Sequence, residues 1–564
     1  MFDAAPASAL GDLADRYWRW TCREFPLTAF MAGVHNEDPV MFRESPADFA
    51  RRDGEAESML AELDAINMHA LDMAGRATHQ LLRRELADMR TAYQLGAHQR
   101  PWLLPVGPEF STLFFSNMSS VSDAETAQLY VGRLASLPAF FADVQANLRA
   151  GRARGFRYPR VVVDRAQSNL RAVIQGPADT SPWYGPFKRS VAGGSAEVQT
   201  QAARALHVIS TQIVPALAAW ADLLRDEIAP HARSSIACTD DAMGREYYKH
   251  WVAHFTNTDQ SPETIHALGL AEALRVEQEI EGIAAEAGYA GDVAGYRRFI
   301  AQDPQFIAPH AQALQERMEV VAKRIDRQIP AFFGRVPRTT YGVELIPPAL
   351  APRMPPAYAQ PNPGDGSNSG ILWVSGLPEK CPLYLLPSLA LHEGWPGHLM
   401  HLALMQEAEE LPAFRRHNAV KYTACLEGWA LYCEGLGEEM HLYRTAHERF
   451  GKLDMELWRA LRLVVDTGIH WIGWSREQAI DAMDSRLSLG RATIEAEVDR
   501  YIALPAQALA YQIGNLKFRE LRAQAEATLG ARFNLRTYHD RLMAAGPVTL
   551  PVLGEIVDAW LATA

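Results

Sequence analysis

The chain of 564 residues is predicted to be mainly α-helical, with one small β-sheet and two helical lobes. Three observations predict this fold class. Apolar residues recur every three or four positions over most of the chain, which is the spacing of an amphipathic helix. Residues 334–388 depart from that spacing, because they are rich in Pro, Gly and Asn and contain two short β-type segments. A stretch with histidines and a glutamate in close succession follows directly, at residues 389–401.

Residues 1–230 are expected to form a helical N-terminal lobe. In its first helix, Leu10, Leu13, Tyr17 and Trp20 lie on one face. No pattern in this lobe carries visible chemistry, so we expect a helical shell that walls a cleft. Its helices are predicted over residues 7–35, 45–95 (two helices), 123–150 and 195–227.

Residues 231–564 are expected to hold the functional site, with the small sheet at about 334–388. Ser261 and Pro262 suit the cap and the first position of a helix. The two lobes are expected to form one continuous structural unit. Further helices are predicted over residues 262–288, 310–328 and 459–470.

Charge and cysteine content exclude several classes of protein. The net charge is −12 and the two signs are mixed along the chain, which argues against a nucleic-acid partner and against a polybasic membrane contact. Five cysteines without a Cys-x-x-Cys pair fit a reducing compartment better than a disulfide framework. The N-terminus has no basic start followed by an apolar run, and no later stretch is expected to span a bilayer. The expected location is therefore cytoplasmic.

A metal site is predicted at His392, Glu393 and His398. Two histidines that hold a metal, with a glutamate directly after the first as general base, form the core of a zinc hydrolase site. The usual spacing between the histidines is four residues on one helix face, whereas here it is six. On an unbroken helix, six residues would place the second histidine about 120° away from the first. Pro396 and Gly397 lie between them, so we expect a bulge that absorbs the two extra residues.

The third metal ligand is expected to be a carboxylate on a later helix. Glu427 follows His398 by 29 residues and has apolar neighbours, where a glutamate is seldom buried unless it is paired or coordinates a metal. The alternative is an ion pair of Glu427 with Arg459 or Arg462. Glu434, one heptad further on, is expected either to orient a ligand histidine or to be the ligand itself. Of the two glutamates, Glu427 is the favoured ligand.

These motifs resemble a known family. His-Glu-Gly-Trp-Pro-Gly-His at 392–398 and Leu-Glu-Gly-Trp-Ala-Leu-Tyr at 426–432 are similar to the bacterial family called domain of unknown function 885. The resemblance runs from the first helices to the end of the chain. Proteins of this family look like distant relatives of all-helical zinc peptidases of the thimet oligopeptidase and Taq carboxypeptidase type. The resemblance implies a zincin-like fold with a deep central cleft. Three further segments carry it: residues 261–270, 465–474 and 505–514.

The small sheet has a functional and a structural interpretation. In zinc peptidases, an edge strand ahead of the metal helix pairs with the substrate backbone by strand addition. We assign this role to residues 370–375, with Gly370, Leu372 and Val374 as substrate-binding residues. The alternative is a purely structural hairpin.

Four later residues are candidates for contact with the substrate or its transition state. Asp466 and His470 are four apart and share a helix face, so the carboxylate would orient the imidazole toward the scissile carbonyl or the substrate terminus. The alternative is a hydrogen bond within the wall of the cleft. Arg462 would recognise a carboxylate. Tyr511 is the best match to the tyrosine that stabilises the oxyanion in the helical zinc peptidases that this chain resembles, with core packing as the alternative.

The sequence therefore predicts a metallopeptidase with one zinc per chain, held by His392, His398 and Glu427. Short peptides would be hydrolysed, by carboxypeptidase or oligopeptidase action, with Glu393 as the general base. Other divalent metals suit the same donors. The alternatives are a metal-dependent hydrolase of a non-peptide amide and a non-catalytic protein that binds a peptide or small molecule. Substrate identity and oligomeric state are left open.

Overall fold

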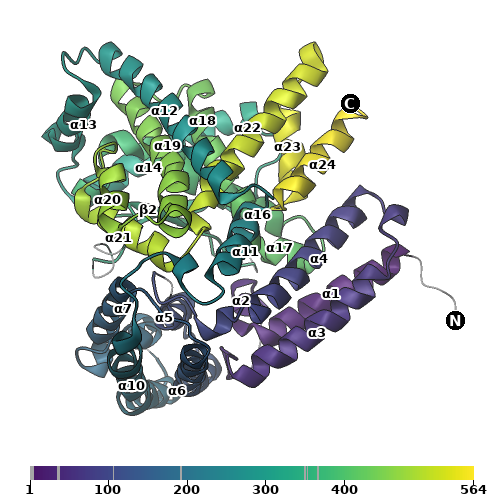
Figure 1. Ribbon diagram of the computed structural model, residues 1–564, viewed down its shortest axis with the longest axis vertical. Coiled ribbons are helices and arrows are strands. Elements are labelled where there is room, and N and C mark those ends of the chain that lie inside the picture. The colour runs from purple at the N-terminus through teal and green to yellow at the C-terminus, as the bar shows by residue number, and fades with distance from the viewer. Residues whose placement is uncertain are drawn as a thin grey trace.

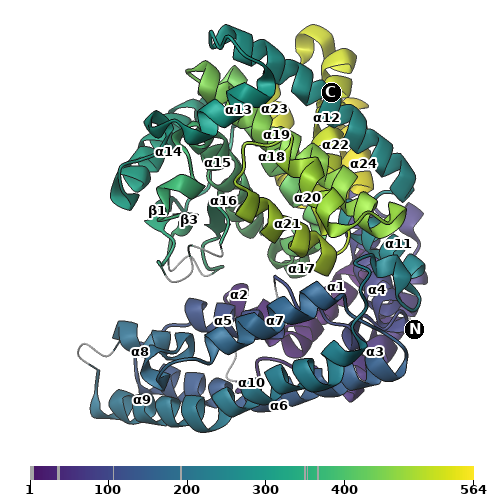
Figure 2. The same ribbon diagram turned by 60° about the vertical axis from the view of Figure 1, so that its left-hand side comes forward.

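The protein is mainly helical and contains a three-stranded sheet, as the sequence predicts. The computed structural model describes residues 6–34, 38–105, 107–190, 194–348, 351, 354–364 and 368–564. Figures 1 and 2 show helices α1 to α10 gathered in one layer, while the sheet and helices α12 to α24 form the other layer.

The first layer follows the predicted helices with one interruption. The helix expected over residues 7–35 is divided at Phe25, because Pro26 has no N–H to continue it and instead opens the next helix. The helices of this layer are α1 (Pro6–Glu24), α2 (Pro26–Met31), α3 (Pro46–Asp64), α4 (Met73–Gln94), α5 (Pro108–Met118), α6 (Ala124–Ala153), α7 (Arg160–Val173), α8 (Gly185–Ser190), α9 (Ala196–Val208) and α10 (Val214–Leu223).

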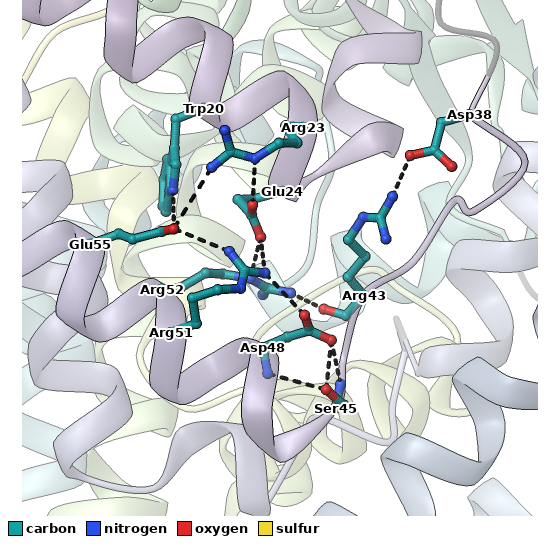
Figure 3. Close-up of polar contacts among 10 residues, drawn as sticks. All are labelled: Trp20, Arg23, Glu24, Asp38, Arg43, Ser45, Asp48, Arg51, Arg52 and Glu55. Carbon is teal, nitrogen blue, oxygen red and sulfur yellow. Dashed lines mark hydrogen bonds and ion pairs between the residues drawn. The ribbon is translucent and has the colours of Figure 1, made fainter.

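Polar side chains join α1 to α3 (Figure 3). The carboxylate of Glu24 is almost fully buried and accepts hydrogen bonds from Arg23 and Arg51. Trp20 donates its indole N–H to Glu55 at 2.6 Å. Because a buried carboxylate is stable only when it is paired, these contacts hold the two helices in a defined register.

One long helical segment differs from expectation. Residues Ala196–His231 run through α9, π-helical turns and α10, and by length and composition alone they would be able to cross a bilayer. No such stretch was expected. However, Ile209, Leu217 and Trp220 are buried in the core, and this segment packs on α6. The core helix of a soluble protein can have the same length and apolar composition, so these two properties are only weak evidence for a membrane span.

The second layer is built on two pairs of packed helices, α12 with α19 and α18 with α22. Ser261 caps α12 by accepting from the backbone N–H of Thr264, and Pro262 occupies the first turn, as predicted. The helices are α11 (Gly244–Thr256), α12 (Pro262–Glu286), α13 (Val293–Gln302), α14 (Ala311–Phe332), α15 (Leu386–Glu393), α16 (His398–Gln406), α17 (Ala413–His417), α18 (Thr423–Glu439), α19 (Ala446–Thr467), α20 (Arg476–Asp484), α21 (Arg491–Ala503), α22 (Ala510–Leu529), α23 (Leu535–Ala545) and α24 (Leu550–Leu561).

The sheet lies beside α15 and α16 and consists of β1 (Tyr341–Leu345), β2 (Ala357–Gln360) and β3 (Gly370–Val374), in the order β1-β3-β2. Strand β3 pairs in parallel with β1 and antiparallel with β2. It is therefore the central strand, and both of its hydrogen-bonding edges are used. The prediction that Gly370, Leu372 and Val374 bind a substrate backbone is wrong for this reason, and Leu372 and Val374 are fully buried.

Candidate metal centre

The two predicted ligand histidines lie on separate helices. Helix α15 ends at Glu393 and α16 begins at His398, so the chain makes a tight turn where the sequence analysis expected a bulge within one helix. The turn folds back on α15 so closely that a Cβ at Gly397 would lie 2.0 Å from the carbonyl oxygen of His392. Glycine is required there, because any side chain would clash with the backbone of α15.

The turn brings both histidines to Glu427 of α18. Nε2 of His392 lies 3.5 Å from Oε2 of Glu427, and Nε2 of His398 lies 3.3 Å from the same oxygen. The two imidazole rings are perpendicular, with centroids 4.9 Å apart. One donor atom from each of the three residues lies within 4.8 Å of the others, a grouping with the size and chemistry of a metal site.

Glu434 lies on the other side of His392. Its Oε1 is 2.8 Å from Nδ1 of His392 and 3.5 Å from Nη2 of Arg459. Since Nε2 of the same ring faces Glu427, the two glutamates occupy different positions: Glu427 faces the second histidine, while Glu434 is placed to orient the first. The sequence left open an ion pair of Glu427 with an arginine. In the structure, the two histidines are the near partners of Glu427 instead.

The three residues stabilise one another electrostatically. Burial alone would lower the pKa of His392, but the hydrogen bonds to Glu427 and Glu434 outweigh it and raise this pKa to about 9. Burial alone would raise the pKa of Glu427, but His398 and His392 hold it well below its usual range.

Glu393 lies next to these residues and is partly exposed. Burial raises the pKa of its carboxyl, although the charges of His392 and His398 oppose that shift. A raised pKa makes this carboxylate better suited to accept a proton.

Tyr511 and Arg462 are brought together beside the helix of Glu427. Helices α18 and α22 approach at Gly428 and Gly514, and Tyr511 lies one turn before that contact. The guanidinium carbon of Arg462 is 4.3 Å from the centroid of the Tyr511 ring. Tyr511 is 9% exposed and so is largely buried between the packed helices; its predicted role at the oxyanion stays a prediction.

Arg462 is buried, and two of its three nitrogens have partners inside the protein. Its Nε donates to the hydroxyl of Tyr501 at 3.0 Å, and its Nη2 lies 3.1 Å from Glu497. Its Nη1 has no hydrogen-bond partner among the described residues. The predicted contact of Arg462 with a substrate carboxylate therefore stays a prediction.

The predicted catalytic role of His470 is wrong. Its Nδ1 accepts from the backbone N–H of Cys238 at 3.1 Å, so Nε2 carries the proton and donates to the carbonyl of Tyr501 at 2.9 Å. The ring is fully buried, and burial lowers its pKa to about 4, which keeps it neutral. Both nitrogens are used in tying backbone segments together.

Asp466 does not orient His470 either. It accepts from the hydroxyl of Tyr248 at 2.7 Å and from the backbone N–H of Ala506. The four-residue spacing predicted a shared face, but residues Gly468–Ile472 form a π-helical turn, which changes the direction of the following side chains.

Trp429 was not singled out by the sequence analysis, although it connects the two motifs. Its indole N–H donates to the carbonyl of Pro396 at 2.9 Å, and the ring is fully buried. The hydrogen bond ties α18 to the turn between the two histidine helices. The repetition of Glu-Gly-Trp in both motifs was the available signal.

The family model described as "Bacterial protein of unknown function (DUF885)" matches residues 26–557. The chain belongs to the DUF885 family. Membership agrees with the resemblance seen in the two Glu-Gly-Trp motifs. No curated protein matches this DUF885 chain.

Two solved structures resemble this DUF885 protein over nearly its whole length. A protein described as "the putative lipoprotein from Colwellia psychrerythraea" is 26% identical and has a TM-score of 0.93, with 99% of this chain and 100% of that chain covered. "A putative lipoprotein of unknown function from Shewanella oneidensis" is 17% identical and has a TM-score of 0.73, with 97% and 99% covered. The second likeness shows the fold alone.

Proposed function

We propose that this DUF885 protein is a metal-dependent hydrolase of amide bonds in short peptides. The observation that carries the proposal is the convergence of His392, His398 and Glu427, whose donor atoms lie within 4.8 Å of one another. Glu393 follows His392 directly and interacts electrostatically with all three residues. Two imidazoles, one carboxylate and an adjacent glutamate are the set of groups used by zinc hydrolases. A binding protein has no need of the fourth group.

The donor set fits zinc, and we propose one ion per chain. Glu434 accepts from Nδ1 of His392, which leaves the lone pair of Nε2 directed at the site. Nδ1 of His398 has no hydrogen-bond partner among the described residues, and its Nε2 lies toward Glu427. Manganese, cobalt and iron suit the same donors. When bound, the ion would activate a water molecule and polarise the substrate carbonyl.

The residues of the chain would do the following. The carboxylate of Glu393 accepts a proton from the attacking water and passes it to the leaving amine. The hydroxyl of Tyr511 donates to the oxygen of the tetrahedral intermediate, while Arg462 holds the ring by stacking. We further propose a zincin-like arrangement with a cleft between the two layers. This cleft would admit extended peptides and exclude folded proteins.

Carboxypeptidase or oligopeptidase action follows from such a cleft. The cytoplasmic location and the expected lack of nucleic-acid and membrane partners stay predictions. The lipoprotein description belongs to the two solved relatives, and cell fractionation of this protein would show whether it shares their description.

Metal analysis of purified protein tests the proposal, with His392→Ala and Glu393→Gln beside the wild type. We expect one zinc per chain in the wild type and in Glu393→Gln, and loss of zinc in His392→Ala. Hydrolysis of a peptide library should be lost in both variants. A wild type that stays metal-free after zinc is added would contradict the proposal and favour a binding protein. Bound zinc without peptide turnover would point to a non-peptide amide.

A further inference from the structure

The two halves of the metal centre are connected through the other layer of the molecule. His398 opens α16 and Glu427 lies in the second turn of α18. Between them, residues 407–422 run to the N-terminal layer and back. This connection contains α17, which packs on α1 (Figures 1 and 2). The N-terminal layer therefore contacts the chain just before it supplies the third ligand.

Glu85 of α4 is the centre of that contact. Its side chain is 4% exposed, and its two oxygens accept four hydrogen bonds. Three of the four donors come from residues 418–422, directly ahead of α18, and the fourth comes from α1. The donors are Asn418 Nδ2 at 2.9 Å, Lys421 Nζ at 2.9 Å, the Tyr422 hydroxyl at 2.5 Å and the Tyr17 hydroxyl at 2.6 Å.

The charge of Glu85 is matched by Lys421. Burial alone would lower the pKa of Lys421, but the attraction of Glu85 outweighs it and raises this pKa, so the lysine is charged. The Lys421 side chain is 30% exposed, so removal of the Glu85 charge acts mainly through the loss of the hydrogen bonds that the buried carboxylate accepts. Replacing Glu85 would therefore release the segment that its carboxylate holds.

A second set of contacts holds residues 407–422 in place. Arg415 donates to the hydroxyl of Thr78 at 3.3 Å and to the carbonyl of Ala545 at 2.7 Å. Phe414 packs its ring edge-on against Tyr17, with centroids 5.6 Å apart. Thr78 lies on α4 and Ala545 on α23, so Arg415 ties α17 to both layers. The hydroxyl of Tyr422, the residue that precedes α18, donates to Glu85.

We propose that Glu85 is a positioning residue of the metal centre. It touches no ligand, and it acts by fixing where α18 begins and hence where Glu427 lies relative to His398. The N-terminal lobe then has a role beyond walling a cleft, since it completes the geometry of a site that lies in the other lobe. This inference rests on the proposed function, because it presumes that the site binds a metal.

The experiment compares Glu85→Gln with a matched control, Asp499→Asn. Asp499 is 2% exposed, forms an ion pair with Arg165 of α7 at 2.6 Å and accepts a hydrogen bond from Arg476 at 2.7 Å. It is thus another buried carboxylate between the layers, but it does not touch residues 407–422. Zinc affinity is measured by competition with a chelator. Amide hydrogen exchange of residues 418–430 is measured in the metal-free protein.

We expect Glu85→Gln to weaken zinc binding on the order of tenfold, as removal of groups that support ligands typically does. It should also speed exchange in residues 418–430. Asp499→Asn should lower Tm and leave both readouts unchanged. If Glu85→Gln does not fold, Tyr422→Phe takes its place. It removes one of the four hydrogen bonds and keeps the ring, so it should weaken zinc binding by a smaller factor.

Unchanged zinc affinity in Glu85→Gln, or in Tyr422→Phe where Glu85→Gln does not fold, would overturn the inference and leave the proposed function standing. An equal loss in Asp499→Asn would also overturn it, because general destabilisation would then explain the effect. Failure of the wild type itself to bind zinc would overturn the inference together with the proposed function.

Discussion

Glu434 contacts His392, one of the proposed metal ligands, at the ring nitrogen that faces away from Glu427. It lies at a cavity of about 310 Å³ between α12, α18, α19 and α22, which is lined mainly by ion-paired side chains. One of its oxygens holds Nδ1 of His392, while the other has no hydrogen-bond partner among the described residues. The oxygen that holds His392 also lies 3.5 Å from Nη2 of Arg459, so Glu434 joins the histidine to a buried arginine.

We expect Glu434→Gln to lower zinc affinity by about 10- to 100-fold, because the neutral amide holds the imidazole less firmly and makes it a poorer donor. Chelator competition measures the change. The control is Glu439→Gln, which removes an exposed carboxylate of the same cavity that pairs with Arg522. Equal affinities for Glu434→Gln and the wild type would show that Glu434 does not act on the site.

A stability measurement tests the structural role assigned to His470. His470→Ala would leave the backbone N–H of Cys238 and the carbonyl of Tyr501 without partners in a buried place. Each unsatisfied group costs about 1–3 kcal/mol, so the free energy of unfolding should fall by several kcal/mol. Urea denaturation gives this value. Zinc affinity of the folded variant should match the wild type, and a specific loss of turnover at full stability would restore the catalytic interpretation.

At the scale of elements, the contact of α18 with α22 positions Glu427, the proposed metal ligand on α18. A Cβ at Gly428 would lie 2.4 Å from Cα of Gly514, and one at Gly514 would lie 1.9 Å from the carbonyl oxygen of Ala424. Both helices therefore need glycine at the level of Glu427. The sequence analysis noted these glycines as parts of motifs, but their close approach is a property of the packed pair.

Gly514→Ala tests this helix contact. The added methyl group has to push the helices apart, which should lower the free energy of unfolding by about 1–3 kcal/mol. Because Glu427 moves with α18, zinc affinity should fall too. Gly435→Ala is the control on the same helix, since nothing lies within 4 Å of its Cβ position, and it should be neutral or slightly stabilising. Equal stability of the two variants would refute the argument.

At the scale of the whole molecule, the two layers depend on each other through residues far apart in the chain. Glu85 meets residues 418–422, and Arg165 meets Asp499. The sequence analysis found no catalytic or ligand motif in the N-terminal layer. This layer contributes to the candidate site through packing and hydrogen bonds rather than through reactive groups. A buried carboxylate such as Glu85 has no local signal, since it lies on an ordinary amphipathic helix.

The sequence by itself determined the helical class, the small sheet and the positions of the three candidate ligands. The helical class follows from local periodicity, and the sheet follows from the Pro- and Gly-rich composition of residues 334–388. The candidate ligands follow from the histidines and glutamates of the two motifs. Only the tertiary structure decided that β3 is the central strand, that His470 and Asp466 tie backbone segments together, and which glutamate faces which nitrogen of His392. Strand order and hydrogen-bond partners are set by packing between segments that are distant in the sequence. No periodic pattern in the sequence indicates either of them.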